Sequence, residues 1–365
     1  MSAPHYELIE GDFASFFAAP KHAYGDKSLF VSMMKPDMER WLDAKANPLF
    51  ADGGGRAFFA VKKDGVPIGR IVAHDHSASN AKYKNKRAYF GFFDCADDQR
   101  AASMLLSAAE AWGKSRGHVE IAGNFNLTAM QQIGVVVAGF ENQPYSDQVY
   151  NPPHVVKLLE GAGYKRFFPM STFELEVAKA KISEPDAGAA WELRGITRRG
   201  LNRVMEDARQ VLNDGFADNP MFVPVTGEEF FFQAKDMMWI IDPRISSLAY
   251  LDGKPVGVVV CIPDLNPLMK ATGGTLGVST LWHYLRFRMN RRRAVIIYYS
   301  VCKAHHGKGL MKHMLHATLK KLTGAGYERV GITWIADENK ASLRQMERLG
   351  AAKHHSTTLF GKKFT

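Results

Sequence analysis

The sequence predicts an α/β protein built from two similar units. Three observations support this fold class: a length of 365 residues, alternating strand-like and helix-like segments, and the same order of segments in both halves. A chain of this length suits two domains of about 150–200 residues each. Apolar residues make up 46% of the chain and charged residues 23%, as in globular proteins, which argues against disorder or a fibrous repeat.

The first half shows the order strand, strand, strand, helix, strand. Apolar residues between Ala101 and Trp112 recur at the i, i+3, i+4 spacing of one helical face. The strand-like segments are apolar and are separated by Gly- and Asp-containing turns. The segments expected are strands at 57–62, 68–73 and 89–93, a helix at 101–112 and a strand at 119–122.

The second half repeats this order. It has expected strands at 248–251, 256–262 and 294–301, a helix at 310–322 and a strand at 330–335. In both halves an Asn then opens a short helix that closes on Gly, at 151–163 and at 339–350. Residues 178–190 are small and polar and include a proline, which is typical of a linker. We therefore expect two copies of one α/β unit, at 1–180 and 181–365.

The charge is unevenly distributed. Residues 1–180 contain 20 Lys and Arg and 20 Asp and Glu, whereas residues 181–365 contain 27 and 17, which accounts for the net charge of +10. A basic half indicates an anionic partner: a phosphate-bearing cofactor, a nucleic acid or a lipid surface.

Location and metal content are predicted from what the sequence lacks. No apolar run approaches the roughly 20 residues of a membrane-spanning helix, and no basic segment opens a secretory signal. The three cysteines are widely spaced and have no zinc-ligand spacing. We expect a cytoplasmic protein with buried, reduced cysteines and no metal.

One glycine-containing loop carries the clearest chemical signal. The strand ending at Val301 leads into His306-Gly307-Lys308-Gly309-Leu310-Met311 and then into the helix. Glycines allow a close approach of backbone and ligand, and the free N–H groups and dipole of a helix N-terminus favour an anion. An ordinary turn before a helix is the alternative. The spacing matches neither a Walker A loop nor a dinucleotide fingerprint.

In this context the loop resembles the Gcn5-related N-acetyltransferase (GNAT) superfamily, whose motif is Arg/Gln-x-x-Gly-x-Gly/Ala. His306 takes the Arg/Gln position, Gly309 matches the Gly, and Met311 takes the last Gly/Ala position. The resemblance implies tandem GNAT-like domains and an acetyl-CoA or acyl-CoA donor. The residues implied to bind it are Val301, His306, Gly307, Lys308, Gly309, Leu310, Met311 and Asn339.

Further stretches resemble one bacterial branch of that superfamily with tandem domains. They include Phe90-Gly91-Phe92-Phe93, Tyr150-Asn151-Pro152-Pro153 and Pro263-Asp264-Leu265-Asn266, and they span nearly the whole chain. Bacterial ceramide synthases belong to this neighbourhood. The resemblance therefore implies acyl transfer to an amine, including a long-chain sphingoid amine.

The equivalent loop of the first half, at 94–100, contains three acids and no glycine. Acids suit a helix N-terminus but repel a pyrophosphate. We expect a degenerate first domain that binds no coenzyme A, and one cofactor site per chain at 306–311.

Amine acylation requires a group that takes the amine proton and a group that protonates the leaving thiolate. The candidates are Asp264, Asn266, Glu338 and Tyr150, with His305, His306 and Tyr145 as further possibilities. A turn role for Asp264 and Asn266, a solvated Glu338 and a packed Tyr150 are the structural alternatives. Many superfamily members carry the thiolate acid as a Tyr of the last helix, at the position of Met346 here.

Residues 278–293 form a basic amphipathic segment. Val278, Leu281, Trp282, Leu285 and Met289 share one helical face, and five arginines lie between 286 and 293. This pattern is typical of a helix that lies on an anionic membrane, which would make the cytoplasmic protein peripheral to the membrane's inner face. An ordinary packed helix is the alternative, and no recognition motif supports nucleic acid.

The function predicted is acyl-CoA-dependent N-acylation of an amine. Two alternatives remain: a Fem-like transferase that uses aminoacyl-tRNA, and a non-catalytic protein that binds a membrane surface. Thiol release from the thioester distinguishes the enzyme from the binding protein.

Overall fold

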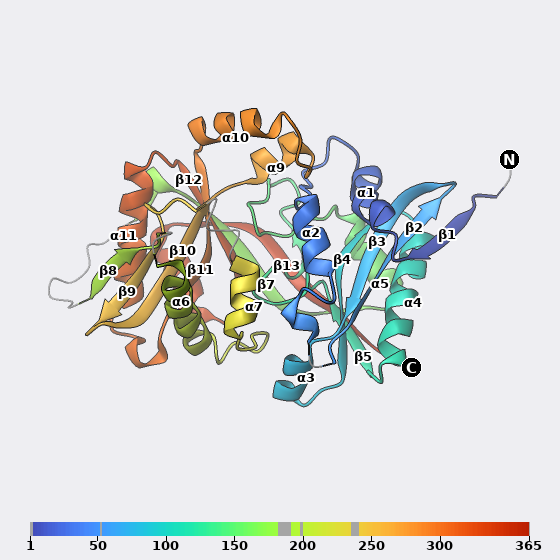
Figure 1. The fold of residues 1–365 in the computed structure, drawn as a ribbon, viewed down its shortest axis with the longest axis horizontal. Coiled ribbons are helices and arrows are strands. Elements are labelled where there is room, and N and C mark those ends of the chain that lie inside the picture. The colour runs from blue at the N-terminus through green and yellow to red at the C-terminus, as the bar shows by residue number, and fades with distance from the viewer. Residues whose placement is uncertain (1–2, 52, 182–190, 198–199, 235–240, 365) are drawn as a thin grey trace.

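The computed structural model describes residues 3–364 except 52, 182–190, 198–199 and 235–240. Two α/β lobes lie side by side and share one long sheet, with helices on both faces (Figure 1). The first half of the chain forms most of one lobe and the second half most of the other.

The elements of the first half confirm the predicted order and add strands and helices at both ends. They are β1 (Tyr6–Glu10), α1 (Phe13–Tyr24), α2 (Lys35–Leu42), β2 (Arg56–Lys63), β3 (Val66–His74), α3 (Ser77–Tyr83), β4 (Arg87–Cys95), α4 (Gln99–Ser115), β5 (Glu120–Gly123), β6 (Val135–Ala138), α5 (His154–Gly161) and β7 (Lys165–Glu176).

The second half also contains every predicted element. Its elements are β8 (Glu192–Gly195), α6 (Leu201–Gly215), α7 (Gly227–Ala234), β9 (Ser247–Leu251), β10 (Lys254–Pro263), α9 (Asn266–Thr272), α10 (Thr280–Met289), β11 (Arg293–Val301), α11 (Leu310–Gly324), β12 (Arg329–Ala336), α12 (Lys340–Leu349) and β13 (Ala352–Lys363). Short 3₁₀ turns lie at Pro48–Phe50, Val177–Lys179 and Lys303–His305.

The two halves exchange strands at the centre of the sheet. The strand order is β1-β2-β3-β4-β5-β13-β7-β12-β11-β10-β9-β8, and β6 also pairs with β13. Thus β7, from the first half, pairs with β12 of the second half, and the last strand, β13, returns to pair with β5. Of the predicted linker, residues 182–190 lie outside the described part of the chain. The boundary between 180 and 181 stays a prediction.

Helices cover both faces of the sheet in each lobe. Successive residues of a strand point to opposite faces, so neighbouring residues pack against different helices. In β10, Val258 packs in the cluster below α6, whereas Val259 packs in the cluster below α11. In β3, Ile71 packs in the cluster of α4 and Val72 in the cluster of α1 and α2. The same layering in both lobes supports the predicted repeat.

The described residues contain no helix that is long and apolar enough to cross a membrane. Within the same residues, no group of three or more His, Cys, Asp or Glu side chains is arranged to hold a metal ion. Cys95 and Cys261 are buried, Cys302 is half-buried, and all three are free thiols.

Candidate active site

The glycine loop between β11 and α11 has a backbone that requires glycine at two positions. Gly307 has φ +75° and Gly309, which caps α11, has φ +83°. Side chains with a Cβ rarely adopt this left-handed conformation. At both glycines a Cβ atom would meet nothing within 4 Å, so the space beside the loop is open.

The N-terminus of α11 is available to a ligand. No side chain of the described residues caps it. The first N–H groups of a helix have no partner within the helix, and together with the helix dipole they favour an anion. They border a cavity of about 1000 Å³ that is lined by the loop, α11, the end of β11 and α12. We call this the loop cavity.

Positive charge around the loop cavity comes from several segments. Lys181 lies just after the 3₁₀ turn at Val177–Lys179, Lys312 lies in the first turn of α11 and Arg348 lies in the last turn of α12. All three line the cavity. Three cations around an uncapped helix N-terminus suit a pyrophosphate and a further phosphate. The sequence did not point to these three residues, because they are far apart in the chain and none belongs to a recognisable motif.

Most of the residues predicted to bind the cofactor line the loop cavity. His306, Gly307, Gly309, Leu310, Met311, Val301 and Asn339 are among its walls. Lys308 is exposed and is not among the residues that line the cavity, whereas Lys312 is.

Several of these side chains have structural contacts of their own. A ring nitrogen of His306, Nε2, donates to the Val301 carbonyl at 2.9 Å, which holds the loop against the strand end. The side chain of Asn339 accepts from Ser342 N at 3.0 Å and caps α12. Met311 is partly buried against the core below α11 and also forms part of the wall of the loop cavity.

In the first half the corresponding helix N-terminus is occupied by a carboxylate of the protein. Asp98 caps α4 by accepting from Ala101 N at 3.1 Å. Its other oxygen accepts from Tyr6 Oη at 2.7 Å and from Lys63 Nζ at 2.8 Å. An anionic ligand would have to displace this carboxylate.

The sheet opens between the parallel strands β11 and β12. Their pairing runs from Arg293–Arg329 only as far as Ile296–Ile332, although both strands continue. Immediately beyond the last pair, β11 has a bulge against β10: Cys261 pairs with Ile296 and Val260 pairs with Tyr298. A bulge inserts one extra residue and redirects the side chains that follow it.

In the first half the same opening, between β4 and β5, is filled. The pairing of β4 with β5 ends at Phe90–Gly123, and the asparagines that follow β5 form hydrogen bonds with the backbone of β4. Phe92 N donates to Asn126 Oδ1 at 2.6 Å, and Phe93 N donates to Asn124 Oδ1 at 3.2 Å. The second half therefore has the open strand pair.

A second cavity, of about 230 Å³, lies where the two lobes meet. We call it the interlobe cavity. Its walls are largely apolar and come from the segment before α2, from α2 itself and from α9 and β11; they include Val31, Met33, Met38, Trp41, Phe92, Leu265, Met269 and Ile297. Tyr298 lines the interlobe cavity and Tyr299 lines the loop cavity. Two adjacent residues of β11, next to the bulge, thus line different cavities.

Tyr299 was not singled out from the sequence. Its hydroxyl is buried beside Ser342 of α12, and burial raises the pKa of this phenol to about 12. The position expected for the thiolate acid, Met346, is buried in the core below α11. Tyr299 of β11 therefore brings a phenol next to α12, the helix that carries Met346.

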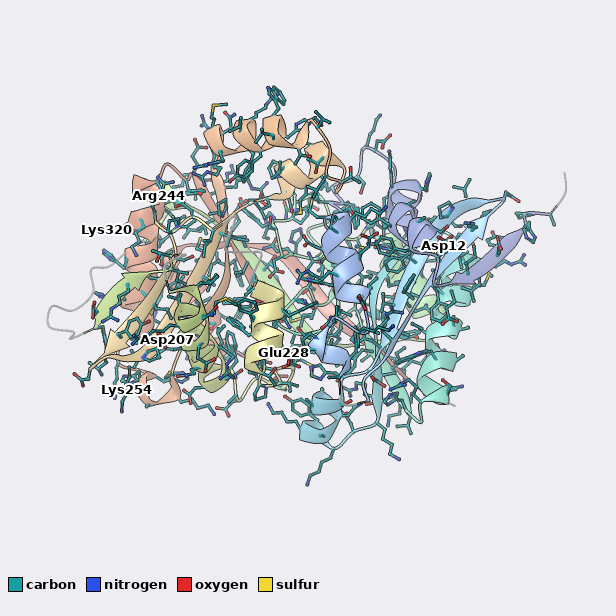
Figure 2. The ribbon with its side chains drawn as sticks, viewed as in Figure 1. Asp12, Asp207, Glu228, Arg244, Lys254 and Lys320 are labelled. Atoms are coloured by element: carbon teal, nitrogen blue, oxygen red, sulfur yellow. The ribbon has the colours of Figure 1, made fainter. Side chains whose placement is uncertain are left out.

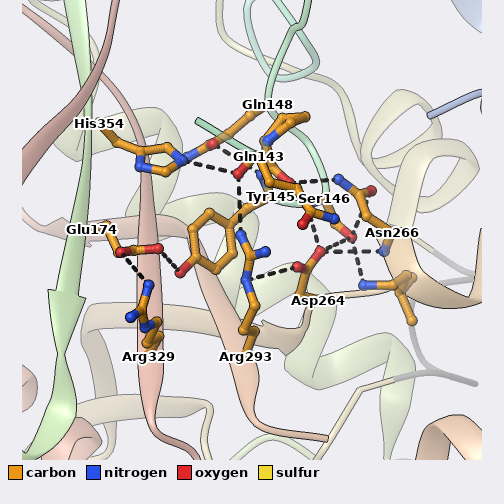
Figure 3. Close-up of polar contacts among 12 residues, drawn as sticks. Gln143, Tyr145, Ser146, Gln148, Glu174, Asp264, Asn266, Arg293, Arg329 and His354 are labelled. Atoms are coloured by element: carbon orange, nitrogen blue, oxygen red, sulfur yellow. Dashed lines mark hydrogen bonds and ion pairs between the residues drawn. The ribbon is translucent and has the colours of Figure 1, made fainter. Parts of the chain in front are cut away.

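Asp264 and Asn266 belong to a buried network between the lobes (Figure 3). Asp264 Oδ1 accepts from Ser146 N at 2.9 Å, from Ser146 Oγ at 3.1 Å and from Asn266 N at 3.2 Å. Arg293 Nε lies 3.3 Å from Asp264 Oδ2, and its guanidinium lies 3.9 Å from the centre of the Tyr145 ring. Burial raises the pKa of Asp264, and the Arg293 charge and the hydrogen bonds oppose that shift.

The remaining predicted residues are separated from one another. Tyr150 lines the interlobe cavity, as does Asn266. Tyr145 is fully buried and donates to Glu174 Oε1 at 2.6 Å. Glu338 is exposed in the turn before α12, outside the walls of both cavities. The structure thus brings Asn266 and Tyr150 to one cavity and leaves Asp264 behind its wall.

Two linked α/β lobes, an open parallel strand pair and a glycine loop at a helix N-terminus define a tandem acyltransferase-type fold. Residues 203–351 match the family described as Acetyltransferase (GNAT). The second half therefore carries a GNAT domain, and the chain as a whole has the tandem GNAT fold.

Relatives and solved structures agree with this class. The chain is 25% identical over 362 residues to "Bacterial ceramide synthase" of Caulobacter vibrioides, covering 95% of this chain and 94% of that protein. It is 25% identical over 369 residues to "Protein YghO" of Escherichia coli, covering 98% and 94%.

Two solved structures have the same fold. A "Tandem GNAT protein from the clavulanic acid biosynthesis pathway" matches with a TM-score of 0.59 and 12% identity, covering 98% of both chains. A GCN5-related N-acetyltransferase from Sphaerobacter thermophilus matches with a TM-score of 0.56 and 13% identity, covering 98% of this chain and 95% of that one.

Proposed function

We propose that this protein transfers an acyl group from acyl-CoA to the nitrogen of an apolar amine. The observation that carries this proposal is the position of the two cavities, which meet Tyr298 and Tyr299 at the open end of β11. An acyl donor held in the loop cavity would present its thioester at this opening. An amine in the interlobe cavity would approach the thioester from the other side.

The loop cavity supports the donor assignment. Its uncapped helix N-terminus and the side chains of Lys181, Lys312 and Arg348 suit the phosphates of coenzyme A. In the first half, Asn126 fills the gap between the parallel strands and Asp98 caps the helix N-terminus. These two features support one donor per chain. Coenzyme A would supply the activated thioester, and the protein would supply orientation and proton transfer.

The interlobe cavity supports an aliphatic acceptor. Its walls contain the side chains of Met33, Met38, Trp41, Phe92 and Met269, which favour a hydrocarbon chain over a sugar or a peptide. The ceramide synthase name carried by a relative at 25% identity agrees with a long-chain amine. We therefore extend the proposal to a sphingoid-type amine as acceptor, with a long-chain acyl-CoA as donor.

Tyr299 is proposed as the group that donates a hydrogen bond to the leaving thiolate. With its pKa raised to about 12, the phenol stays protonated at neutral pH and acts only as a donor. It lines the loop cavity at the strand opening, where the sulfur of a bound thioester would lie.

Thiol release tests this function. The protein is mixed with acyl-CoA of 2 to 16 carbons and with amines ranging from ethanolamine to sphinganine, and free coenzyme A is measured with a thiol reagent. We expect release that requires the amine and is fastest with long-chain amines. A Tyr299→Phe variant is expected to lose about 10²-fold in kcat with an unchanged KM for acyl-CoA. Absence of amine-dependent release in every combination would instead support the binding protein.

We also propose that α10 and the segment before it lie on an anionic membrane surface. No residue of α10 is buried, and the helix lies at the outer surface of the molecule (Figure 2). Leu281 is 67% exposed and Trp282 is 58% exposed, and they lie beside exposed Leu276, Val278, Leu285 and Met289. An apolar patch of this kind on a helix indicates an interaction site.

The structure corrects one part of the charge argument. Arg291, Arg292 and Arg293 form ion pairs with Asp242, Glu328 and Asp264, so they belong to the protein's own contacts. Arg286 and Arg288 remain on α10, where Arg286 lies over the Trp282 ring at 5.5 Å. Two arginines beside an apolar face suit anionic lipid headgroups.

Vesicle flotation tests the membrane proposal. We expect the protein to float with phosphatidylglycerol vesicles and much less with phosphatidylcholine vesicles. A Leu281→Glu/Trp282→Glu variant is expected to lose flotation, and an Arg286→Gln/Arg288→Gln variant to lose its preference for anionic vesicles. A Lys254→Gln/Lys320→Gln variant removes the same charge from other faces (Figure 2) and should float like the parent. Equal flotation of all variants would contradict the proposal.

A further inference from the structure

The interlobe cavity contains an acidic side chain that the Asp264 network does not use. Asp147 lines this cavity and lies in the tight turn formed by residues 145–148. Its backbone is in the left-handed region, with φ +68°. Such a conformation in a residue other than glycine is uncommon, and it persists where the surrounding structure holds it.

Contacts on both sides hold the turn. Ser146, before Asp147, is bound through its N–H and hydroxyl to Asp264. Gln148, after Asp147, accepts from Tyr145 N at 3.0 Å through its side-chain oxygen. The side-chain nitrogen of Gln148 donates to the Ile332 carbonyl at 3.1 Å.

This last contact places the turn at the strand opening. Ile332 is the last residue of β12 that pairs with β11. The Tyr145 ring covers the preceding residue, because a Cβ at Gly331 would lie 2.6 Å from that ring. Asp147 is therefore carried by a rigid turn that is seated on β12 at the point where the two strands separate.

The Asp147 carboxyl has no hydrogen bond or ion pair to any of the described residues, unlike Asp264 and Asp94 in the same region. Burial alone raises its pKa, from 3.8 to about 7. Tyr298 of β11 and Tyr150 are the other titratable groups at this part of the wall, and the Tyr298 hydroxyl donates to the Met130 carbonyl. Arg70, the arginine among the described residues that line this cavity, is already bound to Asp94 Oδ2 at 2.8 Å.

We propose that Asp147 binds the acceptor amine as its ammonium ion and removes its proton for acyl transfer. This inference rests on the proposed function. The Asp147 carboxylate takes one proton from R–NH₃⁺, and the free amine attacks the thioester carbonyl. The C–N bond forms, the C–S bond breaks, and a second proton from nitrogen goes to the thiolate. Asp147 then returns its proton to solvent, which leaves an amide and free coenzyme A.

The Asp147→Asn variant tests this role, since Asn accepts the left-handed backbone and keeps the size of the side chain. The matched control is Asp252→Asn, at an exposed turn residue with φ +50°. With the wild type, kcat/KM for the amine is expected to rise with pH through an inflection near 7. Asp147→Asn should lose 10²- to 10⁴-fold in kcat/KM and lose the inflection, with an unchanged Kd for acyl-CoA. Asp252→Asn should behave like the wild type.

Thermal unfolding supplies a readout that is independent of turnover. Because the folded-state pKa of Asp147 is raised, its contribution to stability is present below pH 4 and is lost as the pH rises through about 7. Asp147→Asn should therefore have a higher Tm than the wild type at pH 8, with the difference shrinking at pH 5.

The two proposals fail in different ways. If the wild type shows no amine-dependent thiol release, the proposed function fails, and this role of Asp147 fails with it. If the wild type is active and Asp147→Asn keeps its rate and its pH inflection, only the role of Asp147 is overturned.

Discussion

Replacing Asp264 with alanine is expected to lower the free energy of unfolding by about 3–5 kcal/mol. The Asp264 side chain is fully buried and accepts three hydrogen bonds, two from Ser146 and one from Asn266 N. It also faces the Arg293 guanidinium, which stacks on Tyr145. Removing the carboxylate leaves these donors and a partly buried charge without their acceptor, and each lost bond to a charged group costs about 1.5–3 kcal/mol before relaxation.

Denaturant or thermal unfolding measures this loss. The milder variant Asp264→Asn keeps an acceptor oxygen and should unfold between the alanine variant and the wild type. A control is Asp218→Ala, which removes an exposed carboxylate paired with Lys303 and should change stability little. If Asp264→Ala is as stable as the control, the network is not a structural support.

The same variants decide between two roles for Asp264. If it were the catalytic base, Asp264→Asn would fold and lose turnover. The structure instead predicts that the folded fraction of Asp264→Asn retains most of its turnover, because the side chain is enclosed behind the wall of the interlobe cavity.

Replacing Gly309 with alanine is expected to weaken acyl-CoA binding at least tenfold. Gly309 caps α11 at φ +83°, where a residue with a Cβ costs roughly 1–2 kcal/mol. The loop can relieve that strain only by turning, which redirects the N–H groups that face the loop cavity. The added methyl group would also project into open space, since nothing lies within 4 Å of its position.

Calorimetric titration with coenzyme A measures this effect. The wild type is expected to bind one molecule per chain. Gly253→Ala is the matched control, because Gly253 has φ +75° and open space in the turn between β9 and β10 and does not line the loop cavity. Both variants should lose similar stability, and only Gly309→Ala should lose affinity. Equal affinities would contradict the loop assignment, and two sites per chain would contradict the inactive first half.

Local pattern was sufficient to predict much of the fold. The apolar spacing in 310–322, the apolar run in 256–262 after the Asp-Gly turn, and the glycines after the strand at 294–301 predicted α11, β10 and the loop, and the structure has all three. Helix formation, strand alternation and glycine conformation depend on residues that are near in sequence. This is why the repeat and the GNAT resemblance were readable from the sequence.

Local pattern did not predict how the two lobes are joined. The segments that form β7 and β13 pair with each other and with strands of both halves, and the longest of these pairings, between Glu120 and Lys363, spans 243 residues. A strand-like sequence predicts a strand but not its neighbour, because the partner is chosen by packing across the whole sheet. The strand exchange was therefore visible only in the structure.

The candidate site, like the fold, was predicted from the sequence only in part. By itself the sequence determined the α/β class, the glycine loop and the basic second half, because each depends on composition or short spacing. Only the tertiary structure decided the roles of acids and phenols. Asp264, expected as a base, is enclosed by Ser146 from the other lobe, whereas Asp147 and Tyr299 were brought to the cavities by long-range contacts. A carboxyl group acquires its chemistry from its surroundings, and here those surroundings are assembled from segments more than 100 residues apart.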